Sequence, residues 1–173
     1  MQEDLLALKS RRAIFSHISG NPGTYLREME TSLNLSVGDL QYHLGQLEKA
    51  GMITAHDDGR RKGYFVAAEV QYFDREAISI IRMRTPRRII IFVLMNPDAA
   101  FSQILAEFNF TKGALSFHLK RLVGSGILIK GKRERESIYR IGDPEKIKNL
   151  LITYQTSIAD EVLDNVVDLF ARI

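Results

Sequence analysis

Residues 36–51 read SVGDLQYHLGQLEKAG, and a closely related stretch returns at residues 111–126 as TKGALSFHLKRLVGSG. At a constant offset of 75 residues, the two stretches are identical at Gly38/Gly113, Leu40/Leu115, His43/His118, Leu44/Leu119, Leu47/Leu122 and Gly51/Gly126. The same register holds without a gap from Asn21-Pro22 and Asn96-Pro97 to Val66 and Ile141. A repeat of this kind indicates one supersecondary unit that occurs twice in the chain.

Each copy of the repeat predicts an amphipathic helix. Its leucines recur at positions i, i+4 and i+7, which places them on one face. Ser36 and Thr111 stand where an N-cap hydroxyl is expected, and Ser36-x-x-Asp39 resembles a capping box. Gly51 and Gly126 suit the left-handed residue that ends a helix. The outer face is then formed by positions 37, 38, 41, 42 and 45 in the first copy, and by 112, 113, 116, 117 and 120 in the second.

The segments around each repeated helix predict two further helices and a β-hairpin. In the first copy we expect helices at 3–19 and 24–32, and strands at 53–55 and 64–66. In the second copy we expect helices at 86–95 and up to about 108, strands at 127–131 and 138–141, and a wing at 132–137. Three helices followed by a hairpin make a winged helix. The predicted fold class is mainly α with small β-hairpins (α+β), with two tandem winged-helix domains plus a long C-terminal helix.

The predicted domain boundaries follow from this order. They are 1–67 for the first winged helix, 68–85 for a helical linker, 86–142 for the second winged helix and 143–173 for the C-terminal helix. Thr85-Pro86 predicts an N-cap followed by proline at the first helical position. Asp143-Pro144 marks the start of the last helix, whose apolar residues recur in steps of three and four up to Ile173. We expect this helix to form a homodimer through residues 144–173; the alternative is that it packs back on its own chain.

Composition narrows the possible functions. The chain has no cysteine, which excludes disulfides, thiolate metal sites and thiol catalysis. The longest apolar run, Ile89 to Met95, is too short for a membrane span, and the N-terminus does not resemble a signal peptide, so we expect a cytoplasmic protein with no membrane association. Residues 76–141 hold twelve Lys and Arg against five Asp and Glu, whereas residues 1–75 hold nine against ten. The second unit is therefore the basic one.

The first unit carries the most specific family signature. Its pattern runs from N-P-G at residues 21–23 through Y-L-R-E-M at 25–29 and L-S-x-G-x-L-x-Y-H-L-x-x-L-E-x-x-G-x-I at 35–53 to D-G-R-x-x-x-Y-F-V at 58–66. This pattern resembles archaeal tandem winged-helix transcriptional regulators. The S-x-H-L-x-x-L core at residues 116–122 is similar to the recognition helix of arsenical-resistance-repressor-like proteins. The resemblance implies a DNA-binding transcriptional regulator. Metal-sensing members use cysteine or clustered histidine, which this sequence lacks, so no cofactor or metal is expected.

A winged helix on double-stranded DNA places its recognition helix in the major groove and basic residues of the wing on phosphates. In the second unit this arrangement predicts contacts from two groups of residues, one on the helix and one on or beside the wing. The helix group is Lys112, Ser116, Phe117, His118, Lys120 and Arg121, and the wing group is Lys132, Arg133 and Arg135, with Lys130 beside them. The alternative is a solvated basic surface that binds nothing.

The first unit offers mostly uncharged groups on its recognition helix. The candidates there are Gln41, Tyr42 and His43, with Arg60, Arg61 and Lys62 on the wing. Direct base reading, phosphate contact alone and protein contact all remain open for this unit. His43 and His118 occupy equivalent positions beside core leucines, so each is either a half-buried helix residue or a DNA contact.

The sequence shows no arrangement of nucleophile, base and acid, and we do not expect an enzyme. The alternative function is a winged-helix protein–protein scaffold in a transcription or chromosome-organising complex. Exposure of Lys112, Lys120 and Arg121 on one surface with the wing would favour DNA binding, and a covered surface would favour the scaffold. A small-molecule effector, the operator and the direction of regulation are not encoded in any pattern recognised here.

Overall fold

The computed structural model describes residues 6–57, 59, 61–69 and 72–154, with only the backbone described at 72 and 73. The chain divides into two compact units, Met1–Ser79 and Ile80–Ile173. Each unit is described by itself below.

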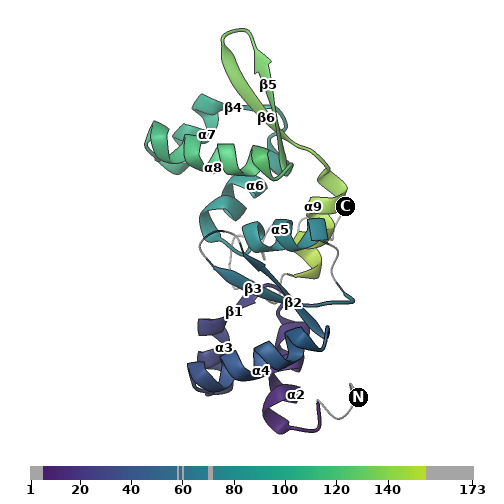
Figure 1. Cartoon of the computed structure of the whole chain (residues 1–173). Coiled ribbons are helices and arrows are strands. Elements are labelled where there is room, and N and C mark those ends of the chain that lie inside the picture. Colours follow the sequence, from purple (N-terminus) through teal and green to yellow (C-terminus); the bar gives the residue numbers. More distant parts are fainter. Residues whose placement is uncertain (1–5, 58, 60, 70–71, 155–173) are drawn as a thin grey trace. The chain divides into compact units, whose positions relative to one another are not determined.

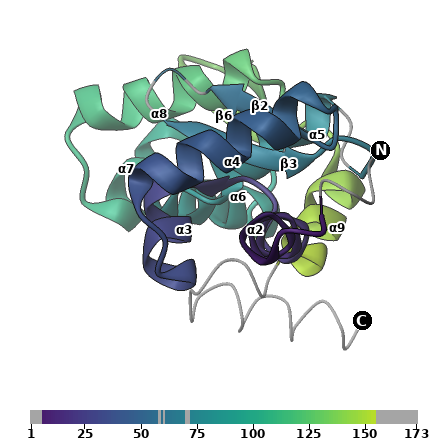
Figure 2. The same cartoon turned by 60° about the horizontal axis from the view of Figure 1, so that its bottom comes forward.

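The first unit is a winged helix. Its elements are α2 (Lys9–Gly20), β1 (Thr24–Tyr25), α3 (Leu26–Leu33), α4 (Val37–Lys49), β2 (Ile53–Asp57) and β3 (Lys62–Val66) (Figure 1). The three strands form an antiparallel sheet in the order β1-β3-β2. The helix α2 is seen nearly along its axis in Figure 2, with α3 and α4 beside it. A further helix, α5 (Tyr72–Ile81), runs across the division between the units.

The second unit repeats this order. Its elements are α6 (Arg84–Met95), β4 (Ala99–Ala100), α7 (Phe101–Phe108), α8 (Lys112–Gly124), β5 (Leu128–Arg133), β6 (Glu136–Ile141) and α9 (Pro144–Thr153). The sheet order is β4-β6-β5, and the β5–β6 hairpin projects beyond the helices of the unit (Figure 1). Thr24 pairs with Tyr64 in the first sheet and Ala99 with Tyr139 in the second, which is the same register at an offset of 75. The predicted fold class and the duplication are confirmed.

The repeated leucines hold each unit together. Leu40, Leu44 and Leu47 of α4 are at most 2 % exposed, and the three equivalent leucines of α8 are as deeply buried. In the first unit they join a core with residues from the other helices and the wing: Ile14, Ile18, Met29, Ile53, Tyr64 and Val66. Burying a leucine side chain stabilises a fold by roughly 1.5–3 kcal/mol, so this stripe fixes which face of each helix turns outward.

The ends of the repeated helices follow the predicted chemistry. The Ser36 hydroxyl accepts from the Asp39 backbone N–H at 3.1 Å, and the Thr111 hydroxyl accepts from that of Ala114 at 3.2 Å. Gly51 and Gly126 have φ of 69° and 76°, in the left-handed region. The Asp39 carboxylate accepts from the Ser36 hydroxyl at 2.7 Å, so the first of these N-caps also holds an acid in place.

Three predicted helix starts differ from the structure. Thr24 and Tyr25 are a short strand rather than the first turn of a helix, because they pair with β3. The helix predicted from residue 3 begins at Lys9 within the described residues, and Leu8 is 49 % exposed at its N-cap. The helix predicted from Thr85-Pro86 begins at Arg84 after Met83. Proline is tolerated in that first turn because the N–H it lacks would have no partner inside the helix.

The hairpin strands are longer than predicted, and this shortens the wings. In the second unit β5 and β6 pair as far as Arg133 and Glu136, so that only Glu134 and Arg135 form the turn in place of the expected loop at 132–137. Glu134 lies in the left-handed region with φ of 54°. Lys132 and Arg133 therefore lie on a strand, whose spacing fixes the position of each basic side chain.

The last helix begins as predicted. The Asp143 carboxylate accepts from the backbone N–H of Lys146 at 3.0 Å, with Pro144 in the first turn. Ile147 and Leu151, the first residues of the predicted apolar stripe, are buried. The remainder of that stripe, residues 155–173, lies outside the described residues. In the part of the chain that is described, no helix has the length and apolar character needed to cross a membrane.

We predict that Thr111→Ala lowers the free energy of unfolding by about 1 kcal/mol, because the first turn of α8 loses a side-chain acceptor. Urea denaturation of the full chain, followed by circular dichroism, measures this. Ser32→Ala is the matched control, since Ser32 is exposed inside α3 and does not occupy an N-cap. Equal stability losses in both variants would contradict the capping role.

Candidate nucleic-acid interface

The outer faces of α4 and α8 are exposed as predicted. The exposed residues of α8 include Lys112, Gly113, Ser116, Phe117 and Lys120, and those of α4 include Val37, Gly38, Gln41, Tyr42 and Gly45. Because the leucines of each helix are buried on the opposite side, these residues are available to a partner. The sequence periodicity was sufficient to identify this surface.

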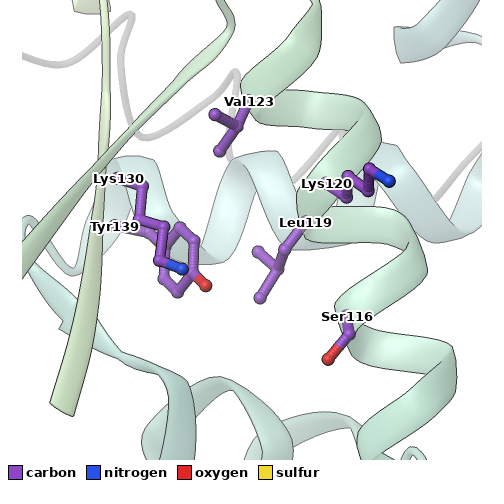
Figure 3. Close-up of a pocket in the computed structure, with 6 residues that line it drawn as sticks. All are labelled: Ser116, Leu119, Lys120, Val123, Lys130 and Tyr139. Carbon is purple, nitrogen blue, oxygen red and sulfur yellow. The ribbon is translucent and has the colours of Figure 1, made fainter.

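An open groove of about 340 Å³ separates α8 from the hairpin of the second unit. It is lined by Ser116, Leu119, Lys120, Val123, Lys130 and Tyr139 (Figure 3). In Figure 3, Lys130 and Tyr139 lie on the strand side, and the Ser116 hydroxyl points into the groove from α8. Tyr139 forms the floor; burial raises the pKa of its phenol, and a hydrogen bond with Ser137 partly offsets this shift. The groove therefore has an apolar floor with Lys130 beside it, and Lys120 lies on the α8 side with its ammonium directed away from the strands (Figure 3).

The hairpin continues this basic surface. Lys132, Arg133 and Arg135 are all exposed at its end. Beside the turn, the Glu136 carboxylate accepts from the backbone N–H of Ser102 at 2.8 Å, and hydrogen bonds from the Ser102 side chain and backbone lower the pKa of this carboxyl. This contact ties β6 to the first turn of α7. The wing is thus joined to the helix that precedes the recognition helix.

Two of the predicted DNA-binding residues of α8, Arg121 and His118, are less exposed than the others. Arg121 is only half exposed, and its Nη1 donates to the Met83 sulfur at 3.5 Å, on the flank of α8 away from the groove. His118 is half buried, with its ring 6.0 Å from that of Phe110 and 5.5 Å from that of Phe117. The half-buried interpretation of His118 agrees with this packing. Helical spacing could not reveal the Arg121 contact, because Met83 lies outside the repeated segment.

The first unit has a groove of about 700 Å³ that is lined by residues of β1, α3, α4 and β3. It is lined by Tyr25, Leu26, Arg27, Glu28, Gln41, Arg61, Lys62 and Tyr64, of which Gln41 and Tyr64 correspond in the repeat to Ser116 and Tyr139. His43 is half buried next to Tyr42 on α4. Arg60 lies outside the described residues. Of the predicted residues, the groove brings together Gln41, Arg61 and Lys62.

The basic groups of this groove contact neighbouring side chains. The Arg61 guanidinium lies 5.2 Å from the ring centre of Tyr25, and the Lys62 ammonium lies 5.3 Å from that of Tyr64. Lys62 also forms an ion pair of 3.2 Å with Glu48. Burial raises the pKa of Tyr64, while Lys62 lowers it and Glu48 raises it. A carboxylate thus accompanies the cations here.

Comparison of equivalent positions shows how the two grooves differ in charge. Lys120 and Lys130 of the second unit stand where the first has Gly45 and Ala55. Glu48 of the first unit stands where the second has Val123. The two grooves therefore carry their charges at different positions: the second has Lys120 and Lys130, and the first has Arg27, Arg61 and Lys62 beside Glu28, with Lys62 paired to Glu48.

Both units match helix-turn-helix families. Residues 8–78 match a family described as an N-terminal HTH domain, and residues 85–130 match bacterial regulatory proteins of the arsR family. An uncharacterized HTH-type transcriptional regulator of Methanocaldococcus jannaschii is 32 % identical over 137 residues, which are 79 % of this chain and 34 % of that protein. The chain thus spans about a third of the length of this archaeal relative.

Two solved structures are similar at a lower level. HlyU from Vibrio cholerae is 18 % identical with a TM-score of 0.41, over 50 % of this chain and 97 % of that one. The endosomal complex ESCRT-II (VPS22/VPS25/VPS36) is 18 % identical with a TM-score of 0.33, over 84 % of this chain and 64 % of that one. At these scores neither similarity bears on function.

The fold and the two matched domains define a protein with two winged helix-turn-helix domains in tandem. The two matched domains resemble those of tandem winged helix-turn-helix regulators, and residues 85–130 match the arsR family. The predicted resemblance is confirmed.

Proposed function

We propose that the protein is a transcriptional regulator that binds double-stranded DNA, with α8 in the major groove and the β5–β6 wing on flanking phosphates. The observation that carries this proposal is the cationic groove of the second unit, where Lys120 from α8 and Lys130 from β5 line one opening. Lys112 at the start of α8 and the three basic residues at the end of the hairpin extend the same charge. An anionic backbone fits such a surface.

The contacts divide by chemistry. The lysines and arginines meet phosphates, which supplies affinity without sequence information, and the outer face of α8 meets base edges through Ser116 and Phe117. Binding releases counterions from roughly six to ten phosphates, with a log–log salt slope steeper than about −5. His118 and Arg121 support this surface from its flank, and direct base contact is assigned to the exposed positions.

The first unit contributes to the same DNA with less electrostatic attraction. Gln41 and Tyr42 are exposed on α4 and can bond or stack without charge, and Arg61 offers a phosphate contact. The ion pair between Lys62 and Glu48 and the exposed Asp39 reduce the positive potential here. We assign this unit a secondary role, in which uncharged groups read bases once the second unit has bound.

We predict that Lys120→Ala/Lys130→Ala weakens binding to DNA from the gene's own upstream region about tenfold or more, and lowers the magnitude of the salt slope by about 2. Fluorescence anisotropy between about 50 and about 200 mM salt measures both quantities. The control variant is Lys146→Ala/Lys148→Ala on α9, which removes the same charge from exposed or half-exposed positions outside the groove. It should leave the affinity and the salt slope nearly unchanged. Weak DNA binding that changes neither with salt nor with either double variant would favour the protein–protein scaffold.

We propose further that two chains pair through the C-terminal segment predicted to dimerise, residues 144–173. Ile147 and Leu151 are already buried within the chain, so the part available to a second chain begins beyond α9. The apolar positions that continue the stripe are Ile158, Val162, Val166, Leu169 and Ile173. A dimer would present four winged helices to a long operator.

We predict that removal of residues 155–173 converts a dimer into a monomer, as measured by sedimentation equilibrium of the full and shortened chains. The shortened chain retains α9, so its two units keep the buried Ile147 and Leu151. Its circular dichroism should show helical content without general unfolding. An oligomeric state that does not change on truncation would contradict pairing through this segment.

A further inference from the structure

An exposed aromatic side chain occupies the same repeat position in both recognition helices. Tyr42 is 60 % exposed on α4, and Phe117 is 51 % exposed on α8. A single exposed apolar residue is common on protein surfaces, but here the same feature recurs at an offset of 75 residues. Each ring lies on the outer face, opposite the buried leucines. Internal packing therefore does not account for either ring.

The histidine that follows each aromatic residue holds its ring. The rings of Tyr42 and His43 lie 5.2 Å apart at 64°, and those of Phe117 and His118 lie 5.5 Å apart at 74°, both edge to face. His118 in turn lies against Phe110, which stacks on Phe108 with centres 5.5 Å apart. Edge-to-face contacts of this kind restrict ring motion. The two histidines are thus positioning residues. Because they restrict the rings of Tyr42 and Phe117, these rings lose little conformational freedom when a partner binds.

A glycine precedes each aromatic residue by one helical turn. A Cβ added at Gly113 would have no heavy atom within 4 Å, and one at Gly38 would have only the Ser36 hydroxyl, at 3.9 Å. Glycine is a poor helix former, and the protein's own packing does not require it here. These glycines allow the helix backbone to approach a partner closely.

We propose that Phe117 and Tyr42 read thymine, by packing their rings against the C5-methyl groups that thymine exposes in the major groove. This inference rests on the proposed function. In the major groove the apolar feature that distinguishes base pairs is this methyl group, and phenyl rings pack on it. Ser116 and Gln41, the residues before the rings, can bond the neighbouring base edges, while Lys112 and Lys120 hold the phosphates. The two helices therefore favour sites with thymine at equivalent places.

The test compares thymine with uracil, which lacks only the methyl group. The upstream DNA is amplified with either nucleotide and titrated with the full chain by fluorescence anisotropy. We predict about fourfold weaker binding to the uracil duplex for each thymine contacted, the effect of burying one methyl group. Phe117→Ala and Tyr42→Ala should each weaken binding to the thymine duplex and reduce the thymine-to-uracil ratio, and together should bring that ratio close to one. Ile152→Ala, a similarly exposed apolar residue on α9, should leave the ratio unchanged.

A ratio near one for the unaltered chain, or a ratio that persists in the double variant while DNA is still bound, would overturn the assignment of thymine to these rings. Failure to bind either duplex would overturn the proposed function and this inference with it. Because uracil also changes duplex flexibility, only the part of the ratio that depends on the two side chains counts as support.

We predict that Gly113→Ala raises the urea midpoint of unfolding yet weakens binding to the thymine duplex, because the added methyl group stabilises the helix and prevents the close approach to its backbone that glycine allows. Gly124→Ala is the matched control at the other end of α8, where a Cβ also meets no heavy atom within 4 Å. It should raise the midpoint without affecting binding. Unchanged affinity in Gly113→Ala would contradict the close approach.

Discussion

Burial of one leucine stripe in each repeated helix is the constraint on which the rest of the structure depends. Leu115, Leu119 and Leu122 are at most 2 % exposed, and no rotation of α8 can keep them buried while hiding its outer face. Burial of these leucines by the hydrophobic effect therefore turns the polar and aromatic groups on the opposite side of the helix outward. The site is a consequence of the core, and its residues are free to vary without loss of fold.

The two units illustrate that freedom. They share helix order, sheet order and strand register, yet the first groove has Glu28 among its three cations, whereas the second is lined by Lys120 and Lys130. Replacing Val123 by its repeat equivalent, Glu48, and Lys120 by Gly45 changes the electrostatic potential without touching a buried leucine. Duplication followed by change at exposed positions gives one chain two winged helices of the same topology, with charges at different positions. Such a pair can divide affinity and selectivity between them.

The sequence was sufficient for the fold class, both recognition helices and their outer faces, because these depend on periodicity and local capping. It was not sufficient for β1 and β4, since a two-residue strand has no period and exists only through pairing with β3 or β6. The contact of Arg121 with Met83 was likewise beyond it, because it joins residues 38 apart in the chain. The sequence identified individual residues of the grooves but not the grooves themselves. Lys130 lies near Ser116 because of the hairpin register, which the turn between β5 and β6 sets.

The short strand β4 gives the second unit a property that its size does not suggest. Ala99 and Ala100 pair with Tyr139 and Ile138, and Glu136 accepts from the backbone of Ser102, so the wing and the segment leading into α7 move as one body. Because the wing and the segment leading into α7 keep a fixed separation, the protein cannot adjust to a duplex whose groove width does not fit that distance. In the proposed complex the double helix must therefore do the bending, and steps that deform easily are favoured at positions no side chain touches. The fixed position of the wing then makes binding depend on the shape of the duplex.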